Sequence, residues 1–324
     1  MSSRKIVIVA MLTIVSISGL IYAYWNGYLF PEYLKIFHAG SLSIPLKEIG
    51  EEFIKLHSRV RIAYESSGSV DAVRKITDLH KSCDVLAVAD YTLIPQMMYP
   101  NHANWTIIFA SNEMVIAYTD QSRYSNEINK TNWYKILNRT DVVIGRADPN
   151  SDPCGYRALM VFQLASIYYG NPSINSSLWN HLNTIIKPKS VELLAGLEAG
   201  TIDYAFEYKS VAVQHSLKYV ELPDELNLKK WELRNYYAQV NVTIQKGEEK
   251  LVIKGKPILY GLTIPRNAEY YNLALEFVKF MLSGEGMQII EECGQNALSP
   301  AYTDNVSNIP VELKSLVVNL PGGW

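Results

Sequence analysis

Three segments of the sequence place hydroxyl groups and small residues where a strand is expected to give way to a helix. They are residues 38–43 (His-Ala-Gly-Ser-Leu-Ser), 65–69 (Glu-Ser-Ser-Gly-Ser) and 152–155 (Asp-Pro-Cys-Gly). A helix N-terminus offers unpaired backbone N–H donors and a partial positive charge, serine hydroxyls add neutral donors, and glycine permits close approach of the backbone. Together such groups can bind an anion without lysine or arginine.

Helix capping is the alternative explanation for each of these segments. Serine, threonine, aspartate and asparagine are common N-cap residues. Asp152 followed by Pro153 fits a plain cap with proline at the first helical position. Capping accounts for any one segment taken alone, whereas three such segments, two of them on neighbouring strands, favour a shared anion site.

No set of catalytic residues stands out in the chain. The sequence contains no Gly-x-Ser-x-Gly elbow, no His-Glu-x-x-His and no phosphate-loop signature. Cys154 is the one candidate for an activated nucleophile near the three segments. We therefore expect a binding protein and no enzyme, with an enzyme on the same scaffold as a less favoured alternative.

The elements that position these segments alternate between strands and helices. In the first part of the chain we expect strands at 34–39, 60–64 and 84–89, with helices after the first two. This alternation predicts a parallel sheet covered by helices. Residues 111–119 are expected to form one long strand that leaves this first lobe.

A second unit is expected between about residues 120 and 256. It contains strands at 141–145 and 203–208, helices at 155–169 and 191–199, and a hairpin made by 236–245 and 250–254. Residues 258–264 are expected to return to the first lobe, and 270–282 to form an amphipathic helix there. The expected fold is therefore an α/β protein of two lobes, each a mostly parallel sheet flanked by helices, joined by two extended hinge crossings.

The expected domain boundaries follow from this order. Residues 1–30 form a signal peptide or N-terminal membrane anchor, 31–118 the first part of lobe 1, 119–256 lobe 2, and 257–324 the second part of lobe 1. Ligand sites in such α/β units lie at the carboxyl ends of strands, which places the site between the lobes.

Composition and the first residues of the chain limit where the protein can act and what it can bind. The 324 residues are 48% hydrophobic with a net charge of −2, which is globular and shows no basic excess for nucleic acid. Arg4 and Lys5 precede an apolar run of roughly 20 residues, a pattern typical of a secretory signal or an uncleaved anchor. We expect the protein to act at the extracellular face of the membrane.

The cysteines add little to this expectation, whereas the glycosylation sequons fit an exported protein. Cys83, Cys154 and Cys293 are too widely spaced for a metal site, and either one disulfide or three thiols is compatible with them. Six Asn-x-Ser/Thr sequons suggest a glycoprotein, at Asn104, Asn129, Asn138, Asn175, Asn241 and Asn305. A glycosylated surface protein without a small ligand is therefore a further alternative.

The motifs, taken in order, resemble the archaeal tungstate/molybdate-binding proteins of ABC importers. The resemblance covers nearly all of the chain after the apolar run. It depends on five stretches together: 36–42, 65–69, 147–157, 202–215 and 255–265. It implies a class II periplasmic-type fold, no cofactor, and a tetrahedral oxyanion held between the lobes. The implied partners are a membrane permease and its ATPase, with the binding protein itself monomeric.

The resemblance also implies which residues contact the anion. The implied ligand-binding residues are Ser41, Leu42, Ser67, Ser69, Asp152, Pro153, Cys154, Ser190 and Tyr208. Ser41 and either Ser67 or Ser69 would donate from the first lobe. The second lobe would contribute Asp152, the backbone after it, a helix start near Ser190, and Tyr208.

Members of this family are similar in bringing two carboxylates to the metal, which raises its coordination from four to six. W(VI) and Mo(VI) are hard centres that accept oxygen ligands. The sulfur of sulfate and the phosphorus of phosphate do not expand their shells readily, so a carboxylate would discriminate against those anions. Asp152 matches the first carboxylate, but Ser190 stands where the second, a glutamate, is expected. Glu192 and Glu207 are the candidates to replace it, or the coordination is reduced.

The sequence thus predicts an extracytoplasmic solute-binding subunit that captures tungstate or molybdate and delivers it to a permease. A binding protein for sulfate, phosphate or another tetrahedral anion is the alternative within the same class.

Overall fold

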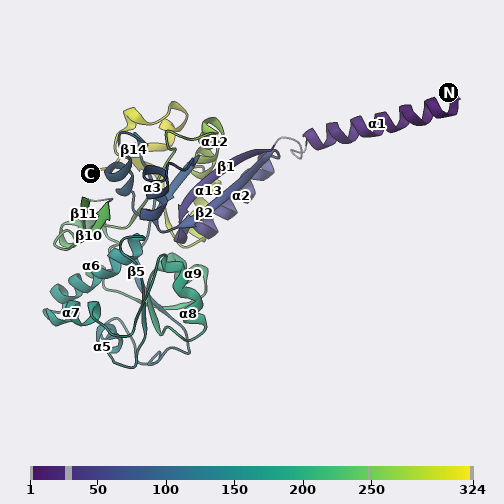
Figure 1. Ribbon diagram of the computed structural model, residues 1–324. Coiled ribbons are helices and arrows are strands. Elements are labelled where there is room, and N and C mark those ends of the chain that lie inside the picture. Colours follow the sequence, from purple (N-terminus) through teal and green to yellow (C-terminus); the bar gives the residue numbers. More distant parts are fainter. Residues whose placement is uncertain (1–2, 26–30, 247–248, 322–324) are drawn as a thin grey trace.

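A computed structural model describes residues 3–25, 31–246 and 249–321 of the chain. Its first helix, α1 (Ser3–Trp25), lies apart from the two lobes in Figure 1. Within the described part of the chain, no helix combines the length and hydropathy needed to cross a membrane. The expected signal or anchor over residues 1–30 stays a prediction, and residues 1, 2 and 26–30 of it lie outside the described residues.

Lobe 1 is built on a seven-stranded sheet with the order β14-β13-β4-β12-β3-β1-β2. Its strands are β1 (Glu32–Ala39), β2 (Val60–Ser67), β3 (Val85–Val88), β4 (Ile107–Ser111), β12 (Leu259–Thr263), β13 (Asn296–Thr303) and β14 (Val317–Asn319). β1 pairs in parallel with both β2 and β3, as the alternation of strands and helices predicts. Residues from both ends of the chain therefore complete one sheet.

Helices cover both faces of this sheet. On one face α2 (Ser43–Leu56) contacts α12 (Tyr271–Met281) and α13 (Gly284–Glu292), and on the other α3 (Ser69–Thr77) contacts α4 (Leu93–Met98). Alternation along β2 separates the faces: Tyr64 reaches the Leu46 carbonyl of α2, while Glu65 pairs with Lys75 of α3. The remaining short segments of lobe 1 are the 3₁₀ turns η1 (Gly40–Leu42), η4 (Val306–Asn308) and η5 (Val311–Leu316).

Lobe 2 is built on a five-stranded sheet with the order β7-β6-β8-β5-β9. Its strands are β5 (Met114–Tyr118), β6 (Ile144–Ala147), β7 (Thr184–Lys187), β8 (Tyr204–Tyr208) and β9 (Lys218–Glu221). Its helices and 3₁₀ turns are α5 (Trp133–Leu137), α6 (Pro153–Tyr168), α7 (Ser173–Trp179), η2 (Ser190–Leu193), α8 (Leu194–Glu198), α9 (Lys209–Gln214), α10 (Asp224–Asn227), η3 (Trp231–Leu233) and α11 (Arg234–Tyr237). The buried helix α6 packs against β6 and β8, with its N-terminus toward lobe 1.

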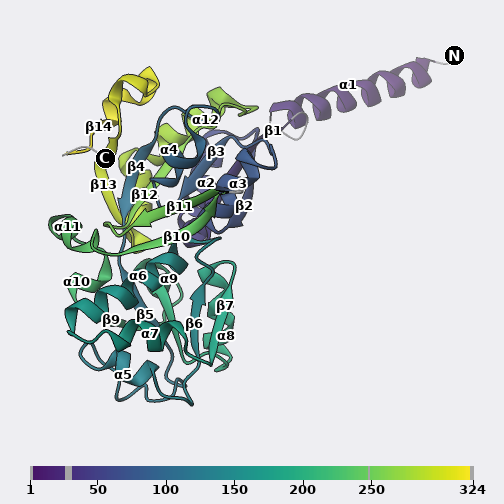
Figure 2. The same cartoon turned by 60° about the vertical axis from the view of Figure 1, so that its left-hand side comes forward.

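A hairpin of β10 (Asn241–Lys246) and β11 (Glu249–Lys254) lies where the two lobes meet (Figure 2). It touches both lobes. Arg74 of α3 donates to the Gln245 carbonyl, and Gln163 of α6 donates to the Asn241 carbonyl over 2.9 Å. The expected strand at 236–245 is wrong in its first part, because residues 234–237 form α11.

Two crossings connect the lobes. The first is the break at Asn112 and Glu113 between β4 and β5, and the second runs from Gly255 to β12. The backbone N–H of Asn112 donates to the Ile258 carbonyl over 3.2 Å, so the crossings are bonded to each other. β5 (Met114–Tyr118) accounts for most of the strand expected at 111–119, but that strand is shorter than expected, because Ser111 ends β4 and residues 112–113 belong to neither strand. β4 and β5 belong to different sheets.

The α/β fold of two sheets is confirmed, but the sheets are mixed and not mostly parallel. β12 returns to lobe 1 antiparallel to both β3 and β4. β5 enters lobe 2 antiparallel to both β8 and β9. β12 and β5 both adjoin a crossing between the lobes, and β13 also pairs antiparallel with β4. Local alternation of strands and helices could not reveal the direction of these strands, because none of them follows a neighbouring strand through a helical crossover.

The three cysteines are buried and free: Cys83, Cys154 and Cys293. This decides the question that the sequence left open in favour of thiols. Of the six sequon asparagines, Asn175 is partly buried and the others are exposed. Glycosylation of this chain stays a prediction.

Candidate functional site

The serines of lobe 1 lie at the carboxyl ends of neighbouring strands. Ser41 follows β1 directly, and Ser67 ends β2 in register with Ala39. All are buried, with exposed fractions of 3% for Ser41, 8% for Ser67 and none for Ser69. The N-cap residues of η1, α2 and α3 are Ala39, Leu42 and Gly68, and none of these three caps has a side-chain hydrogen bond. Capping therefore does not explain why these serines are present.

The three hydroxyls have different partners. Ser69 accepts the backbone N–H of Ala89 over 2.9 Å, which ties the start of α3 to the end of β3. Ser41 accepts the hydroxyl of Tyr260 over 3.0 Å. The Ser67 hydroxyl is buried without a partner among the described residues. Ser41 and Ser67 are thus the hydroxyls with donor capacity left for a ligand, while Ser69 supports the fold of lobe 1.

Asp152 is the N-cap of α6, as the capping explanation predicts. Its Oδ1 accepts the N–H of Cys154 over 2.9 Å, with Pro153 in the first turn. Its Oδ2 accepts the N–H of Ser190 at the start of η2 over 3.1 Å. One carboxylate therefore joins the N-termini of two segments. Burial raises the pKa of Asp152 to about 6, although these two hydrogen bonds oppose the shift.

Glu207 lies beside Asp152, whereas Glu192 does not. Glu207 is fully buried; its Oε2 accepts the N–H of Tyr208 over 2.7 Å and lies 3.9 Å from the Cys154 sulfur. Its Oε1 has no partner within the described chain. Burial raises the pKa of Glu207 to about 8. Glu192 is exposed and pairs with Lys189 at 3.5 Å, so the structure does not bring it into the buried cluster.

A buried guanidinium completes the site from lobe 2, and the sequence analysis missed it. One Nη atom of Arg157 donates to the Tyr208 hydroxyl over 2.6 Å and to the Ala89 carbonyl of lobe 1 over 2.8 Å. The other lies 3.5 Å from the Asp90 carboxylate and has no hydrogen bond in the described structure. Tyr156 also donates to Asp90 over 2.7 Å. This cluster of Asp90, Tyr156, Arg157 and Tyr208 links the lobes.

The charge on Asp90 is stabilised within this cluster. Burial by itself would raise its pKa, but Lys256 and Arg157, together with hydrogen bonds from Tyr156 and Thr92, hold it below the usual value. Asp90 therefore stays ionised and balances the charge of Arg157. The signal that could have revealed the cluster is one arginine within the otherwise apolar stretch of α6.

The lobes are in direct contact around the site. The Ser151 carbonyl of lobe 2 accepts the N–H of Val70 over 3.0 Å, at the first turn of α3. Gly40 lies against Val191, since a Cβ added there would come within 2.9 Å of the valine side chain. The anion-binding candidates of both lobes thus face one interface and not separate regions of solvent.

Three buried polar atoms of this interface have no hydrogen-bond partner among the described residues: the Ser67 hydroxyl, one Nη of Arg157 and one Oε of Glu207. Buried polar groups are nearly always paired, so a group of unpaired ones calls for an explanation. The hydroxyls of Ser41, Ser67 and Tyr208 and the guanidinium of Arg157 can donate here, and the carboxyl groups of Asp152 and Glu207 lie with them. Such a set suits a small, fully oxygenated anion with an electron-poor centre.

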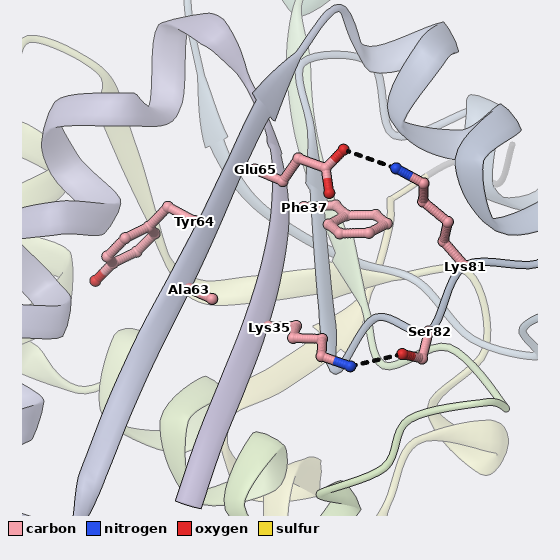
Figure 3. A pocket seen from close by; sticks show the side chains of 7 residues that line it. All are labelled: Lys35, Phe37, Ala63, Tyr64, Glu65, Lys81 and Ser82. Carbon is pink, nitrogen blue, oxygen red and sulfur yellow. Dashed lines mark hydrogen bonds and ion pairs between the residues drawn. The ribbon is translucent and has the colours of Figure 1, made fainter.

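A separate hollow on lobe 1 does not share these properties. Figure 3 shows it on the side of β1 and β2, with a volume of about 430 Å³. Its polar groups pair with one another: Lys35 donates to Ser82 over 2.8 Å, and Lys81 lies 3.6 Å from Glu65. The hollow is open and its cations are neutralised, so the site between the lobes remains the candidate.

The fold has two lobes, and the candidate ligand groups of both lie at the interface between them. Residues 34–295 match the model of a family described as bacterial extracellular solute-binding proteins, and the chain belongs to that family.

Relatives with established names support a narrower comparison. The chain is 44% identical over 311 residues to the molybdate/tungstate-binding protein WtpA of Pyrococcus abyssi, covering 88% of this chain and 89% of the relative. It is also 44% identical to the protein of the same name from Thermococcus kodakarensis, covering 88% and 87%. The resemblance to archaeal tungstate/molybdate-binding proteins is therefore confirmed, as is the expectation of a binding protein in place of an enzyme.

Solved structures agree on the fold. The periplasmic molybdate-binding protein of Azotobacter vinelandii matches with a TM-score of 0.61 at 15% identity, over 81% of this chain and 98% of that one. The sulfate-binding protein SubI of Mycobacterium tuberculosis also matches with a TM-score of 0.61, at 13% identity over 83% and 88%. At such identities the likeness concerns the two-lobed architecture alone.

Proposed function

We propose that this chain captures tungstate or molybdate between its lobes and delivers the anion to a membrane permease driven by an ATPase. The two named relatives bind these anions according to their names. The observation that carries the proposal is the pair of buried serines in lobe 1, Ser41 and Ser67, which cap no helix. Tyr260, which donates to Ser41, packs against Tyr208 of lobe 2 with ring centroids 6.1 Å apart. The chain then works as a monomer outside the membrane, next to its permease.

Each contact has a separate role in this proposal. Ser41, Ser67, the Tyr208 hydroxyl and the α6 and η2 N-termini surround the oxygens of the anion. The Tyr208 hydroxyl accepts a hydrogen bond from Arg157, so its own hydrogen is available to the anion. Leu42, Pro153, Cys154 and Ser190 contribute backbone at the segment starts. The lobes already contact each other around these groups, and the anion would favour this closed state over an open one.

Asp152 and Glu207 would approach the metal centre itself. Both contact Cys154, one through the backbone N–H and the other at the sulfur. Of the candidates for the second carboxylate, Glu207 is the one that lies with Asp152, whereas Ser190 carries no charge. Two carboxylates would select W(VI) or Mo(VI) oxyanions over sulfate, whose centre does not take further oxygen ligands.

Calorimetry of two variants with tungstate and sulfate tests the proposal. Ser41→Ala should lower the affinity for both anions about tenfold, because one hydrogen bond to a charged group is lost. Asp152→Ala should lower the affinity for tungstate and leave the affinity for sulfate unchanged, which lowers the selectivity for tungstate over sulfate. Ser43→Ala is the matched control, since its hydroxyl bonds the Gly40 carbonyl over 2.7 Å. Unchanged selectivity in the Asp152 variant would refute the role of that carboxylate, and sulfate binding tighter than tungstate would favour a sulfate transporter.

Native mass spectrometry of protein purified without added ligand offers an independent check. A bound mass equal to tungstate or molybdate supports the proposal. The absence of any bound oxyanion, together with no thermal stabilisation by tungstate, molybdate, sulfate or phosphate, would contradict it.

A further inference from the structure

A chain of buried side-chain hydrogen bonds runs from the hinge to Ser41. Asn112 of the first crossing donates through Nδ2 to the Tyr260 hydroxyl over 3.0 Å and to the Ser210 hydroxyl over 2.7 Å. Tyr260 of the second crossing donates to the Ser41 hydroxyl over 3.0 Å. All four side chains are at most 3% exposed. The chain therefore joins a serine of lobe 2, both crossings and the candidate anion ligand of lobe 1.

The direction of every bond in this chain is determined by its surroundings. The Oδ1 of Asn112 faces the backbone N–H groups of Glu113 at 2.9 Å and Ser210 at 3.4 Å. A backbone N–H can only donate, so oxygen must face these groups and the NH₂ must face Tyr260. Burial raises the pKa of Tyr260, which keeps its hydroxyl protonated. Tyr260 accepts from Asn112, and its single hydrogen is left for Ser41.

Ser41 consequently keeps its own hydrogen for a further partner. Its oxygen already accepts the hydrogen of Tyr260, so its own hydrogen must point to another acceptor. Its backbone carbonyl is occupied by the side chain of Gln295, which donates over 3.0 Å. The hydroxyl of Ser41 is thus presented to the interface between the lobes as a donor.

We propose that Asn112 and Tyr260 are positioning residues that orient the Ser41 hydroxyl as a hydrogen-bond donor to the bound oxyanion. This inference rests on the proposed function of the site. It also narrows the ligand class, because a fixed donor favours a fully deprotonated dianion over one that carries its own hydroxyl, such as hydrogenphosphate. Neither residue touches the anion; both act through Ser41.

A purely structural role is the competing explanation, in which Asn112 and Tyr260 only brace the hinge. The two explanations differ for Asn112→Asp. An ionised carboxylate keeps the shape and still accepts from Glu113 and Ser210, but it also takes the hydrogen of Tyr260. Tyr260 must then accept from Ser41, and Ser41 turns its lone pairs toward the anion. The direction of the hydrogen bonds from Asn112 through Tyr260 to Ser41 therefore reverses, whereas a purely structural role at the hinge would be largely preserved.

A double-mutant cycle separates this reversal from simple charge repulsion. The four proteins are the wild type, Asn112→Asp, Tyr260→Phe and the double variant, titrated with tungstate by calorimetry at pH 8. We expect Tyr260→Phe to weaken binding about fivefold, since Ser41 loses its orientation and keeps its hydroxyl. We expect Asn112→Asp to weaken binding about 100-fold in the presence of Tyr260 and about tenfold in the Tyr260→Phe background, where only repulsion between charges remains.

The control variant is Tyr99→Phe, which removes a tyrosine hydroxyl of lobe 1 that bonds Thr106 at 2.9 Å, outside the site. Its affinity should equal that of the wild type. If Asn112→Asp lowers the tungstate affinity equally in both backgrounds, the orienting role of Asn112 and Tyr260 is wrong, because charge repulsion alone does not require Tyr260. If the Asn112 variant does not fold, Tyr260→Phe compared with Tyr99→Phe decides, and unchanged binding by both rejects the inference. A wild type that binds none of tungstate, molybdate and sulfate would instead refute the proposed function.

Discussion

Gly68→Ala should separate binding from folding, because Gly68 is the point where lobe 1 lies closest to the backbone of lobe 2. A Cβ added to Gly68 would lie 2.1 Å from the Ser151 carbonyl oxygen and 2.6 Å from its carbon. These are backbone atoms, so no side-chain rotation relieves the overlap. The glycine itself has φ −61° and ψ 147°, a region open to every residue. Alanine is therefore compatible with lobe 1 and incompatible with the observed contact between the lobes.

The size of the effect follows from this overlap. Non-bonded atoms need separations of about 3.5 Å, so the added Cβ and the Ser151 oxygen, 2.1 Å apart, must separate by about 1.4 Å. That movement strains the hydrogen bond from Val70 to Ser151, now 3.0 Å, and every ligand contact that spans the lobes. Overpacking of this kind costs about 1–3 kcal/mol, which corresponds to about 5- to 150-fold weaker binding.

Calorimetry with tungstate and thermal unfolding of the ligand-free protein measure the two sides of this prediction. We expect weaker binding with an unchanged unfolding temperature, because an open arrangement of the lobes accommodates the methyl group. Gly284→Ala is the matched control, since a Cβ there meets nothing within 4 Å. If Gly68→Ala binds tungstate as the wild type does, the contact at Ser151 is not part of the ligand-bound state and the reasoning fails.

Three further variants test the packing and charges around the site. Gly155→Ala places a Cβ 2.5 Å from the Ala147 carbonyl oxygen of the same lobe, so thermal unfolding should show a loss of about 1–3 kcal/mol with or without ligand; a neutral result would contradict the close packing of α6. The pKa of Glu207 is raised to about 8, so the folded protein keeps this proton at pH values where the unfolded chain has lost it. The free energy of unfolding of the wild type should therefore fall by up to about 1.4 kcal/mol per pH unit between about pH 5 and 8. Urea denaturation of Glu207→Gln should show a flatter pH dependence, and identical slopes would argue against a buried proton. Arg157→Met leaves Asp90 without its nearest guanidinium, and we expect a loss of about 3 kcal/mol in the free energy of unfolding; a loss below about 1 kcal/mol would show that Asp90 does not depend on this arginine.

The sequence predicted the parts of the fold that are encoded locally. Apolar periodicity located β1, α2, β2 and β3 and the buried helix α6, because each pattern depends on residues within one or two turns of each other. The serines and Asp152 at the strand ends were recognised for the same reason. β4 was not predicted, and only the strand partners show that β4 and β5, which are both apolar, belong to different sheets.

The second carboxylate shows the limit of sequence reasoning within the site. In the sequence, Ser190 stands where the second carboxylate is expected, and Glu192 and Glu207 are the candidates to replace it. In the structure, Glu207 meets Cys154 at the α6 N-terminus. Packing of α6 over β8, and not strand geometry alone, determines that both side chains are buried in one cluster.

What the sequence by itself determined is the family, the two-lobed α/β architecture and the hydroxyl-rich starts of helices, because these depend on motifs and on contacts between near neighbours. What only the tertiary structure decided is how charges and hydrogen atoms are arranged between the lobes. Arg157 lies beside Asp90, and Asn112 is linked to Ser41 through Tyr260. These residues are far apart in the sequence, so no local sequence pattern predicts the contacts. Because the hinge brings both crossings and both lobes to one buried interface, the partner of each polar group depends on the whole fold.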